Sequence, residues 1–292
     1  MQASAIAEKI TAVSDLIRLR KQYGTALLAL PAMWSLVIAS AGRPSVEHVL
    51  IFLVGSFLMR SAGCAINDVA DRNIDKHVER TKTRPVADGR LGVKESLAVF
   101  AVLSLIALFL VLRLNFFTVK LAAAGLTLAI VYPFVKRISF FPQVVLGVAF
   151  GWGAVMAWAA VHEEIAIAAL LIFIANIFYS TAYDTIYALM DMEDDKKAGV
   201  KSTAIFFGSR VWAALYVFYF LMAACLVGAG ILAGLGVVYY LGVIMTTAAL
   251  CFIVYGIRKN PEPKRAFNGF IANAWAGGFI LFAIIIDFHV SL

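Results

Sequence analysis

Residues 48–75 read HVLIFLVGSFLMRSAGCAINDVADRNID, a mostly apolar run that ends in a cluster of acidic side chains. About 20 apolar residues are enough for a helix to cross the hydrocarbon core of a membrane. At 100° per residue, Asn67, Asp68, Asp71 and Asp75 fall within roughly a quarter of one helix face. Carboxylates this close repel one another and are costly near a membrane, so we expect cationic groups to hold them in place.

A second acidic set comes later in the chain, at Asp184, Asp191 and Asp195. If the helix continues through them, their spacing also places them on one face. Acidic runs in loops are often merely solvated, so the second set indicates a binding site only in combination with the first. Magnesium prefers oxygen ligands and is usually held by one or two carboxylates together with substrate phosphates. Two such faces at the ends of membrane spans therefore predict a site for a magnesium-bound diphosphate.

The composition is that of a polytopic membrane protein. Of the 292 residues, 62% are hydrophobic and 15% are charged, whereas soluble domains are about half apolar and a quarter charged. No charged stretch is long enough for a separate soluble domain, so we expect one integral-membrane domain over residues 1–292. The net charge of +7 comes from Lys and Arg in short loops, which topology explains without a nucleic-acid partner. The three cysteines are widely spaced in apolar sequence and indicate neither a disulfide framework nor a zinc site.

Nine membrane spans are predicted from the apolar runs. Their approximate bounds are 22–42, 48–68, 96–113, 115–135, 139–161, 165–187, 211–233, 236–257 and 266–289. The seventh and eighth come from one uncharged run, which we divide at its cluster of glycines. Lys and Arg gather in the N-terminal segment and after every even-numbered span, while the other loops hold only Arg43 and Arg113. This alternation predicts a cytoplasmic N-terminus and an external C-terminus, with both acidic clusters facing the cytoplasm.

Several basic residues are candidates for binding an anion. Arg60 lies inside the second span, seven residues before Asn67, and shares its face. A guanidinium at that depth either pairs with a carboxylate or contacts an anionic substrate, and the sequence leaves both open. Arg72, inside the acidic motif, and Arg84, before Pro85, are the best candidates for contacting diphosphate. No Walker loop, nucleotide-binding glycine motif, nucleophile elbow or CxxC pair occurs, so ATP-dependent phosphoryl transfer, hydride transfer and acyl-enzyme chemistry lack their signatures.

The first acidic motif, N-D-x-x-D-R-x-x-D at 67–75, is followed by R-T-K-T-R-P at 80–85 and by Gly89-Arg90. This pattern resembles the signature of the UbiA superfamily of intramembrane prenyltransferases. Further matches in family order are Gly24-Thr25, the Y-P-F-x-K-R segment at 132–137, and the segment from Tyr183 to Thr203. The whole pattern is most similar to the 4-hydroxybenzoate polyprenyltransferases of ubiquinone biosynthesis. One departure is R-K-Q-Y at 20–23, where the family commonly has an acidic residue and Pro-Ile.

The resemblance implies an all-α fold of nine helices around a central cavity, in the inner (plasma) membrane, with the active site towards the cytoplasm. It implies transfer of a polyprenyl chain from an allylic diphosphate to the ring carbon ortho to the hydroxyl of 4-hydroxybenzoate, with release of diphosphate. The lipid bilayer, the polyprenyl diphosphate and 4-hydroxybenzoate are the expected partners, and no obligate protein partner is implied.

The resemblance also implies roles for the site residues. Two Mg²⁺ ions would be held by catalytic residues of both acidic sets, which are Asn67, Asp71, Asp75, Asp191 and Asp195. Asp68 and Asp184 would assist in binding the substrate. Contacts to diphosphate are expected from Arg72, Arg84 and Lys201. Asp191 is also a candidate to orient or deprotonate the phenol. For the benzoate carboxylate we expect Arg137 first and Arg60 second.

Three other functions are compatible with parts of the sequence. A prenyltransferase of the same superfamily could act on another acceptor. A secondary transporter would line an ion or substrate path with intramembrane charges, but here only Arg60 lies near the predicted mid-membrane level. A scaffold that has lost catalysis should have a broken acidic motif, and this motif is intact.

Overall fold

The computed structural model describes residues 2–79, 81–135, 137–197 and 199–290, with only the backbone described for residues 2–6 and 194. Within these ranges the regular secondary structure is entirely helical, which confirms the all-α prediction. The short elements are α1 (Gln2–Leu16), α8 (Met192–Lys197), α9 (Thr203–Phe207) and the 3₁₀ turn η1 (Gly208–Arg210). The bundle is made of α2 (Tyr23–Ala39), α3 (Val46–Asp75), α4 (Val93–Val111), α5 (Phe116–Val135), α6 (Pro142–His162), α7 (Ile167–Ala188), α10 (Val211–Ala233), α11 (Val237–Lys259) and α12 (Pro263–Val290).

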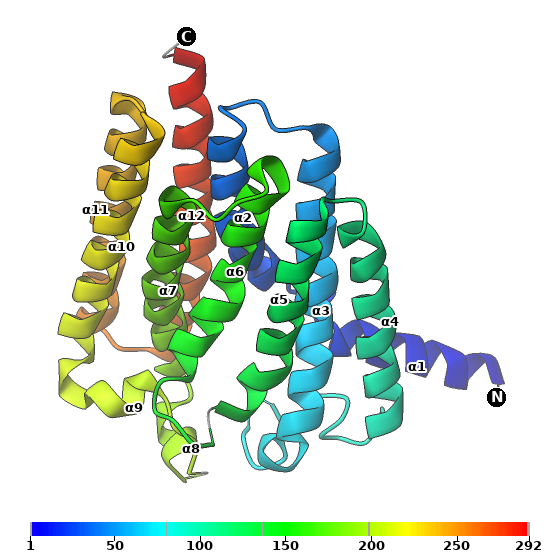
Figure 1. Ribbon diagram of the computed structural model, residues 1–292. Helices are drawn as coiled ribbons and strands as arrows, with labels where there is room; N and C mark the ends of the chain where they lie inside the picture. Colours follow the sequence, from blue (N-terminus) through cyan, green and yellow to red (C-terminus); the bar gives the residue numbers. More distant parts are fainter. Residues whose placement is uncertain (1, 80, 136, 198, 291–292) are drawn as a thin grey trace.

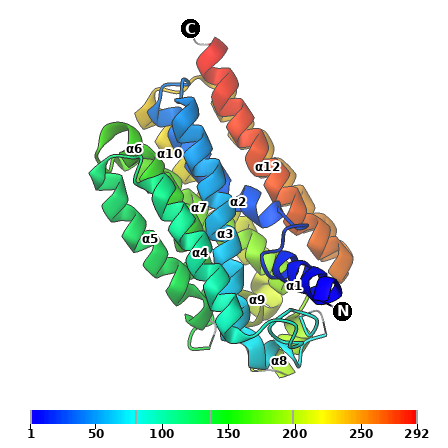
Figure 2. The ribbon, with the colours of Figure 1, turned by 90° about the vertical axis from the view of Figure 1, so that its right-hand side faces the viewer.

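The bundle helices run roughly parallel or antiparallel to one another, and α1 lies crosswise beside them (Figures 1 and 2). Among the described residues, eight helical stretches are long and apolar enough to cross a membrane, and α2 is a shorter apolar helix of 17 residues. These elements occupy the segments that the apolar runs predict as spans. The segment after α3 and the short helix α8 lie at the same end of the bundle, opposite the C-terminus (Figure 1).

The long apolar run after residue 210 is divided where its glycines predict a turn. Gly234 ends α10 in the left-handed conformation, with a φ of 67°, and Gly236 precedes α11. Asp287 of α12 accepts hydrogen bonds from the backbone N–H groups of Gly236 at 2.5 Å and Tyr239 at 3.1 Å. A carboxylate in this position satisfies free N–H groups and opposes the positive end of the helix dipole. Asp287 therefore fixes the start of α11 against α12.

The core lies between α2, α6, α7, α10 and α12. It contains large buried side chains whose polar atoms have partners: the Trp34 indole donates to the carbonyl oxygen of Gly277 at 3.0 Å, and the Tyr219 hydroxyl donates to the Asn273 side chain at 2.9 Å. In contrast, α4 and α5 expose many large apolar side chains, including Phe109. An outward apolar surface of this kind suits contact with lipid rather than water.

The two acidic sets differ in their helical context. α3 continues unbroken to Asp75, so the four polar residues from Asn67 onwards do belong to one helix, as expected. α7, however, ends at Ala188, and a turn separates it from α8. The expectation that Asp184, Asp191 and Asp195 share one continuous helix face is therefore wrong. The apolar periodicity that packs α7 stops at Met190, and the charged residues beyond it have no core to pack against.

Candidate functional site

A cavity of about 1330 Å³ lies inside the bundle, bordered by α2 to α7 and by the segment between α1 and α2. Most of its wall is apolar, and this part includes small residues such as Gly55, Ala107 and Gly125. One end is polar, and its charged and amide side chains include Arg18, Arg60, Asn67, Asp68, Arg84 and Asp184. We call this the polar end. Ile51 also lines the cavity, and at 1.5 Å per residue it lies about 24 Å from Asn67 along α3.

Asp68 at the polar end is neutralised by two arginines. Its side chain is fully buried, and Oδ1 lies 2.7 Å from Arg18 Nη2 and 3.5 Å from Arg84 Nη1. The same Arg84 nitrogen lies 2.9 Å from Asp75 Oδ2. These contacts confirm the expectation that cations hold the acidic face of α3. An unpaired carboxylate at this depth would cost several kcal/mol, so a cationic partner for Asp68 is needed for the helix end to be stable.

α1 and the segment after α3 are tied to this site by further ion pairs. Arg90 bonds Asp15 at 2.7 Å and Asp88 at 2.8 Å, and Lys9 bonds Glu95 at 2.8 Å. The hydrogen bonds from Arg90 to Asp15 and Asp88 raise the pKa of Arg90 above its usual value. Exposed pairs of this kind contribute about 0–1 kcal/mol each. Their effect is mainly to fix the position of α1 beside the polar end.

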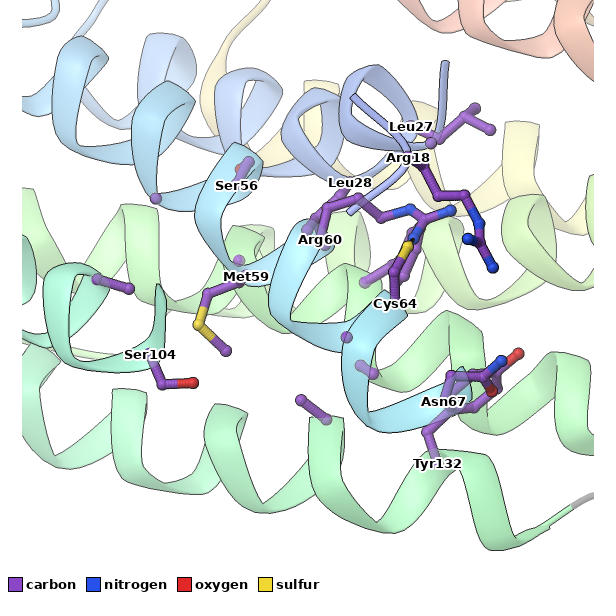
Figure 3. A pocket seen from close by; sticks show the side chains of 18 of the residues that line it. Arg18, Leu27, Leu28, Ser56, Met59, Arg60, Cys64, Asn67, Ser104 and Tyr132 are labelled. Carbon is purple, nitrogen blue, oxygen red and sulfur yellow. Dashed lines mark hydrogen bonds between the residues drawn. The ribbon is translucent and has the colours of Figure 1, made fainter. Parts of the chain in front are cut away.

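Arg60 of α3 is partly buried and lines the cavity (Figure 3). One of its terminal nitrogens donates to Cys64 Sγ, while Nε has no hydrogen-bond partner. The guanidinium lies directly against Gly24 of α2, where a Cβ would collide with it. Among the described residues, no carboxylate lies within ion-pair distance of Arg60. Of the two interpretations left open by the sequence, pairing with a carboxylate is therefore not the one observed.

Tyr132 of α5 connects the two acidic regions. It lines the polar end of the cavity (Figure 3) and interacts electrostatically with Arg60, with Asp71 of α3 and with Asp184 of α7. The ends of α3 and α7 therefore approach one another around this phenol. In sequence Tyr132 stood out only as part of a motif, since an aromatic residue in an apolar span carries no signal of its own.

The remaining residues of the first acidic region lie around the polar end without lining the cavity. Asp71 and Asp75 are buried at 0% and 4% exposure. Arg72 is exposed and donates to the carbonyl oxygen of Val69 in its own helix at 2.8 Å. Arg80 of the family motif lies outside the described residues.

The loop between α5 and α6 brings the second acidic region close to the first. Arg137 donates to the carbonyl oxygen of Ala70 in α3, and its guanidinium lies 5.8 Å from the centre of the Phe134 ring. Lys201 donates to the carbonyl oxygen of Ile138 in the same loop at 3.3 Å. The acidic end of α3, this loop and the segment after α8 are thus neighbours. Neither Arg137 nor Lys201 is among the residues that line the cavity.

Asp191 and Asp195 are half-buried around α8, and Asp195 donates its backbone N–H to the carbonyl oxygen of Asp191 at 2.8 Å. In the part of the chain that the structure describes, no three His, Cys, Asp or Glu side chains converge as a group that could hold a metal.

Arg18 is a residue of the polar end that sequence reasoning missed. Four basic residues precede the first span, and their excess is explained by topology alone. Only the folded chain shows that one of them returns to Asp68, 50 residues later. No periodicity could have revealed this contact, because Arg18 lies in a turn between two helices.

The sequence of this chain is similar to those of a known protein family. The model of the UbiA prenyltransferase family matches residues 28–276. The 4-hydroxybenzoate octaprenyltransferase of Polynucleobacter asymbioticus is 43% identical over 289 residues, covering 98% of this chain and 100% of that protein. The enzyme of the same name from Azotobacter vinelandii is 46% identical over 277 residues, covering 94% and 93%.

Solved structures share the fold. A UbiA homologue from Aeropyrum pernix K1 superposes with a TM-score of 0.73 at 25% identity, covering 90% of this chain and 97% of that one. A UbiA homologue from Archaeoglobus fulgidus bound to GPP and Mg²⁺ gives a TM-score of 0.69 at 19% identity, covering 94% and 99%.

Proposed function

This chain belongs to the UbiA prenyltransferase family, and we propose that it transfers a polyprenyl chain from an allylic diphosphate to 4-hydroxybenzoate in ubiquinone biosynthesis. The substrate is supported by relatives named 4-hydroxybenzoate octaprenyltransferase that align over nearly the whole chain. The observation that carries the proposal is the cavity, which joins an apolar interior to a polar end containing Arg60, Asn67, Asp68 and Arg84. An isoprenoid diphosphate has the same division between an apolar tail and a charged head.

The protein is an integral membrane protein, as its apolar helices and family membership indicate. We propose that α2 is the ninth span, that the N-terminus is cytoplasmic and the C-terminus external, and that residues 1–292 form a single domain of the inner membrane. The distribution of Lys and Arg supports this orientation. The segment after α3 and the α8 region share one end of the bundle, so the active site would face the cytoplasm.

The donor set fits a divalent metal in its chemistry. Asn67, Asp71, Asp75, Asp191 and Asp195 supply carboxylate and amide oxygens, which Mg²⁺ prefers. The buried Oδ2 of Asp68 also has no hydrogen-bond partner. Mg²⁺ commonly uses only one or two carboxylates and completes its shell with phosphate oxygens and water, so a convergence of three protein carboxylates is not required. We propose that these five residues hold Mg²⁺ together with the diphosphate. When bound, the metal would neutralise negative charge on the leaving group.

The chain's own cations would act on the same leaving group. Arg84 lies at the polar end and already contacts two carboxylates of α3. Arg72 and Lys201 remain predicted diphosphate contacts, and both lie near the polar end without lining the cavity. As the allylic carbon–oxygen bond breaks, diphosphate leaves with the electron pair, and fixed guanidinium groups would stabilise its increasing charge.

The apolar part of the cavity would protect the allylic cation that remains. Bulk water would quench this cation, whereas a mostly apolar wall keeps bulk water away from it. The ring carbon ortho to the phenol would attack the cation, forming the new carbon–carbon bond, and the ring proton would then pass to a base. Asp191 was predicted to assist at the phenol. Asp184 lines the cavity and interacts electrostatically with Tyr132, so it also lies in the right region.

We place the benzoate carboxylate at Arg60. Both Arg60 and Arg137 were candidates, but Arg60 lines the cavity and its Nε lacks a hydrogen-bond partner. Arg137 is engaged with Ala70 and Phe134 outside the cavity wall, and it remains the alternative. A carboxylate would supply Arg60 with the counter-charge that no carboxylate among the described residues provides.

The proposed function is tested with purified protein in lipid, magnesium, a radiolabelled allylic diphosphate and a panel of aromatic acceptors. Prenylated 4-hydroxybenzoate should form and should disappear in excess EDTA. A product with a different acceptor would retain the family and overturn the substrate. Transport without any prenylated product would overturn the enzyme itself.

A further inference from the structure

Arg18 has an unusual backbone for an arginine. Its φ of 57° lies in the left-handed region, which costs a non-glycine residue about 1 kcal/mol or more. The side chain is held by two hydrogen bonds: Nη1 donates to the carbonyl oxygen of Asp15 at 2.6 Å and Nη2 to Asp68 Oδ1 at 2.7 Å. It is nevertheless 20% exposed and lines the cavity (Figure 3). The backbone at Arg18 is thus strained, and its guanidinium lies at the polar end.

Neutralising Asp68 does not require this arrangement. Arg84 lies within 3.5 Å of the same Asp68 oxygen and is itself paired with Asp75. The charges around the cavity are also unequal. Its lining includes six basic residues and three acidic ones, the basic ones being Arg18, Arg20, Lys21, Arg60, Arg84 and Arg90. A lining with excess positive charge is suited to an anion of more than one negative charge.

We propose that Arg18 and Arg84 form a two-arginine clamp for the diphosphate, oriented by Asp68. Asp68 is then a positioning residue that holds both guanidinium groups, rather than a direct ligand of the substrate. An arginine has five N–H donors in a planar fork, so the two hydrogen bonds of the Arg18 side chain leave donors for phosphate oxygens. This inference rests on the proposed function and deepens it, because it assigns α1 and the turn after it to the diphosphate site.

The surroundings of α1 favour this role over a loosely attached membrane-surface helix. Ala12 and Leu16 are buried against Ala65 and Val69 of α3. The ion pair Lys9–Glu95 joins α1 to α4, and the ion pair Asp15–Arg90 joins α1 to the segment before α4. Arg18 is therefore presented by a fixed element, so little ordering cost accompanies binding.

The test compares Arg18→Gln and Arg18→Lys with Arg113→Gln. The Arg113 side chain is 71% exposed, pairs with Glu47, and lies beyond the far end of α4 from the polar end. The measurements are kcat, the KM for the allylic diphosphate and the KM for the aromatic acceptor. A second measurement, which requires no turnover, is the thermal stabilisation of each variant by inorganic pyrophosphate with Mg²⁺.

Loss of charge-assisted hydrogen bonds should raise the KM for the diphosphate about 10- to 100-fold in Arg18→Gln. The KM for the acceptor should stay unchanged, and stabilisation by pyrophosphate should be lost. Arg18→Lys should retain part of both, and Arg113→Gln should behave as wild type. Asp68→Asn should raise the same KM as Arg18→Gln, and the double variant should add little, because both changes disrupt one clamp.

Several results would overturn the clamp. In one, Arg18→Gln keeps the wild-type KM for the diphosphate and the wild-type stabilisation by pyrophosphate. Arg18 would then have only a structural role, even if the ligand-free melting temperature of the variant falls. In another, the increase in KM is confined to the aromatic acceptor. If Arg18→Gln does not fold, the same comparisons are made with Arg18→Lys. A wild-type protein that forms no prenylated product but is stabilised by pyrophosphate through Arg18 would overturn the proposed function and leave the clamp intact.

Discussion

Replacing Arg60 by methionine tests the assignment of the acceptor carboxylate. Methionine preserves much of the unbranched stem while removing the charged guanidinium, which lies beside Gly24. A hydrogen bond between charged groups contributes about 1.5–3 kcal/mol, so the variant should lose about 10- to 150-fold in kcat/KM for 4-hydroxybenzoate. The KM for the allylic diphosphate should change little.

Varying the acceptor as well tests the contact between Arg60 and the carboxylate specifically. An analogue with a neutral amide in place of the carboxylate should be a poor acceptor for the wild type, because Arg60 would remain buried without its counter-charge. Arg60→Met should treat the acid and the amide nearly alike. The interaction energy of this double change measures the contact between the two groups directly. The same cycle with Arg137→Met is the matched control.

Two results would refute the reasoning. If Arg60→Met still prefers the acid by the wild-type factor, Arg60 does not contact the carboxylate. If Arg137→Met abolishes the preference instead, Arg137 is the carboxylate ligand, and its contacts with Ala70 and Phe134 must change when the substrate binds.

Chelation of divalent metal should abolish product formation and readdition of Mg²⁺ should restore it; activity that persists in excess EDTA would remove the metal from the mechanism. Asp71→Asn should lower turnover by orders of magnitude while the melting temperature reports whether the fold survives, and a folded variant with wild-type turnover would contradict the role of the α3 acidic face. Asp287→Ala should destabilise the protein by about 1–2 kcal/mol because the start of α11 loses its cap, whereas Asp287→Asn should cost less, and equal melting temperatures for wild type and both variants would contradict the capping role. A reporter fused to the C-terminus should be accessible only from outside the cell, since a cytoplasmic signal would exclude nine spans with a cytoplasmic N-terminus.

The sequence predicts those features that depend on local pattern. Apolar runs locate the bundle helices, and the glycines near residue 234 locate the turn between α10 and α11. The acidic face of α3 follows from spacing within a single helix. Local pattern also explains why Asp191 was wrongly placed on the same helix face as Asp184. The helical spacing was extended past Met190, but beyond it charged residues replace the apolar side chains that would have packed the next turn.

Contacts that depend on tertiary structure could not be predicted in this way. The pairing of Arg18 with Asp68 joins residues 50 positions apart, and the contact of Arg137 with Ala70 joins residues 67 positions apart. Both involve basic residues in segments where topology already explains a positive charge. The sequence therefore predicted that cations would meet the acidic face, but it did not identify which ones: Arg18 was not a candidate, and Arg84 was expected to contact diphosphate.

Asp68 and Arg60 differ in how their charges are compensated within the cavity. Asp68 is buried and is neutralised by two arginines, so the protein itself meets the cost of burying that carboxylate. Arg60 is partly buried, yet its hydrogen-bond partner among the described residues is a thiol, and its buried Nε has no partner there. A protein that can place two cations on one carboxylate has the means to place a carboxylate beside Arg60 as well. An intramembrane charge left without a counter-ion is best explained by a ligand that brings one, and an aromatic acid entering the cavity would do so at the site where its ring must meet the allylic carbon.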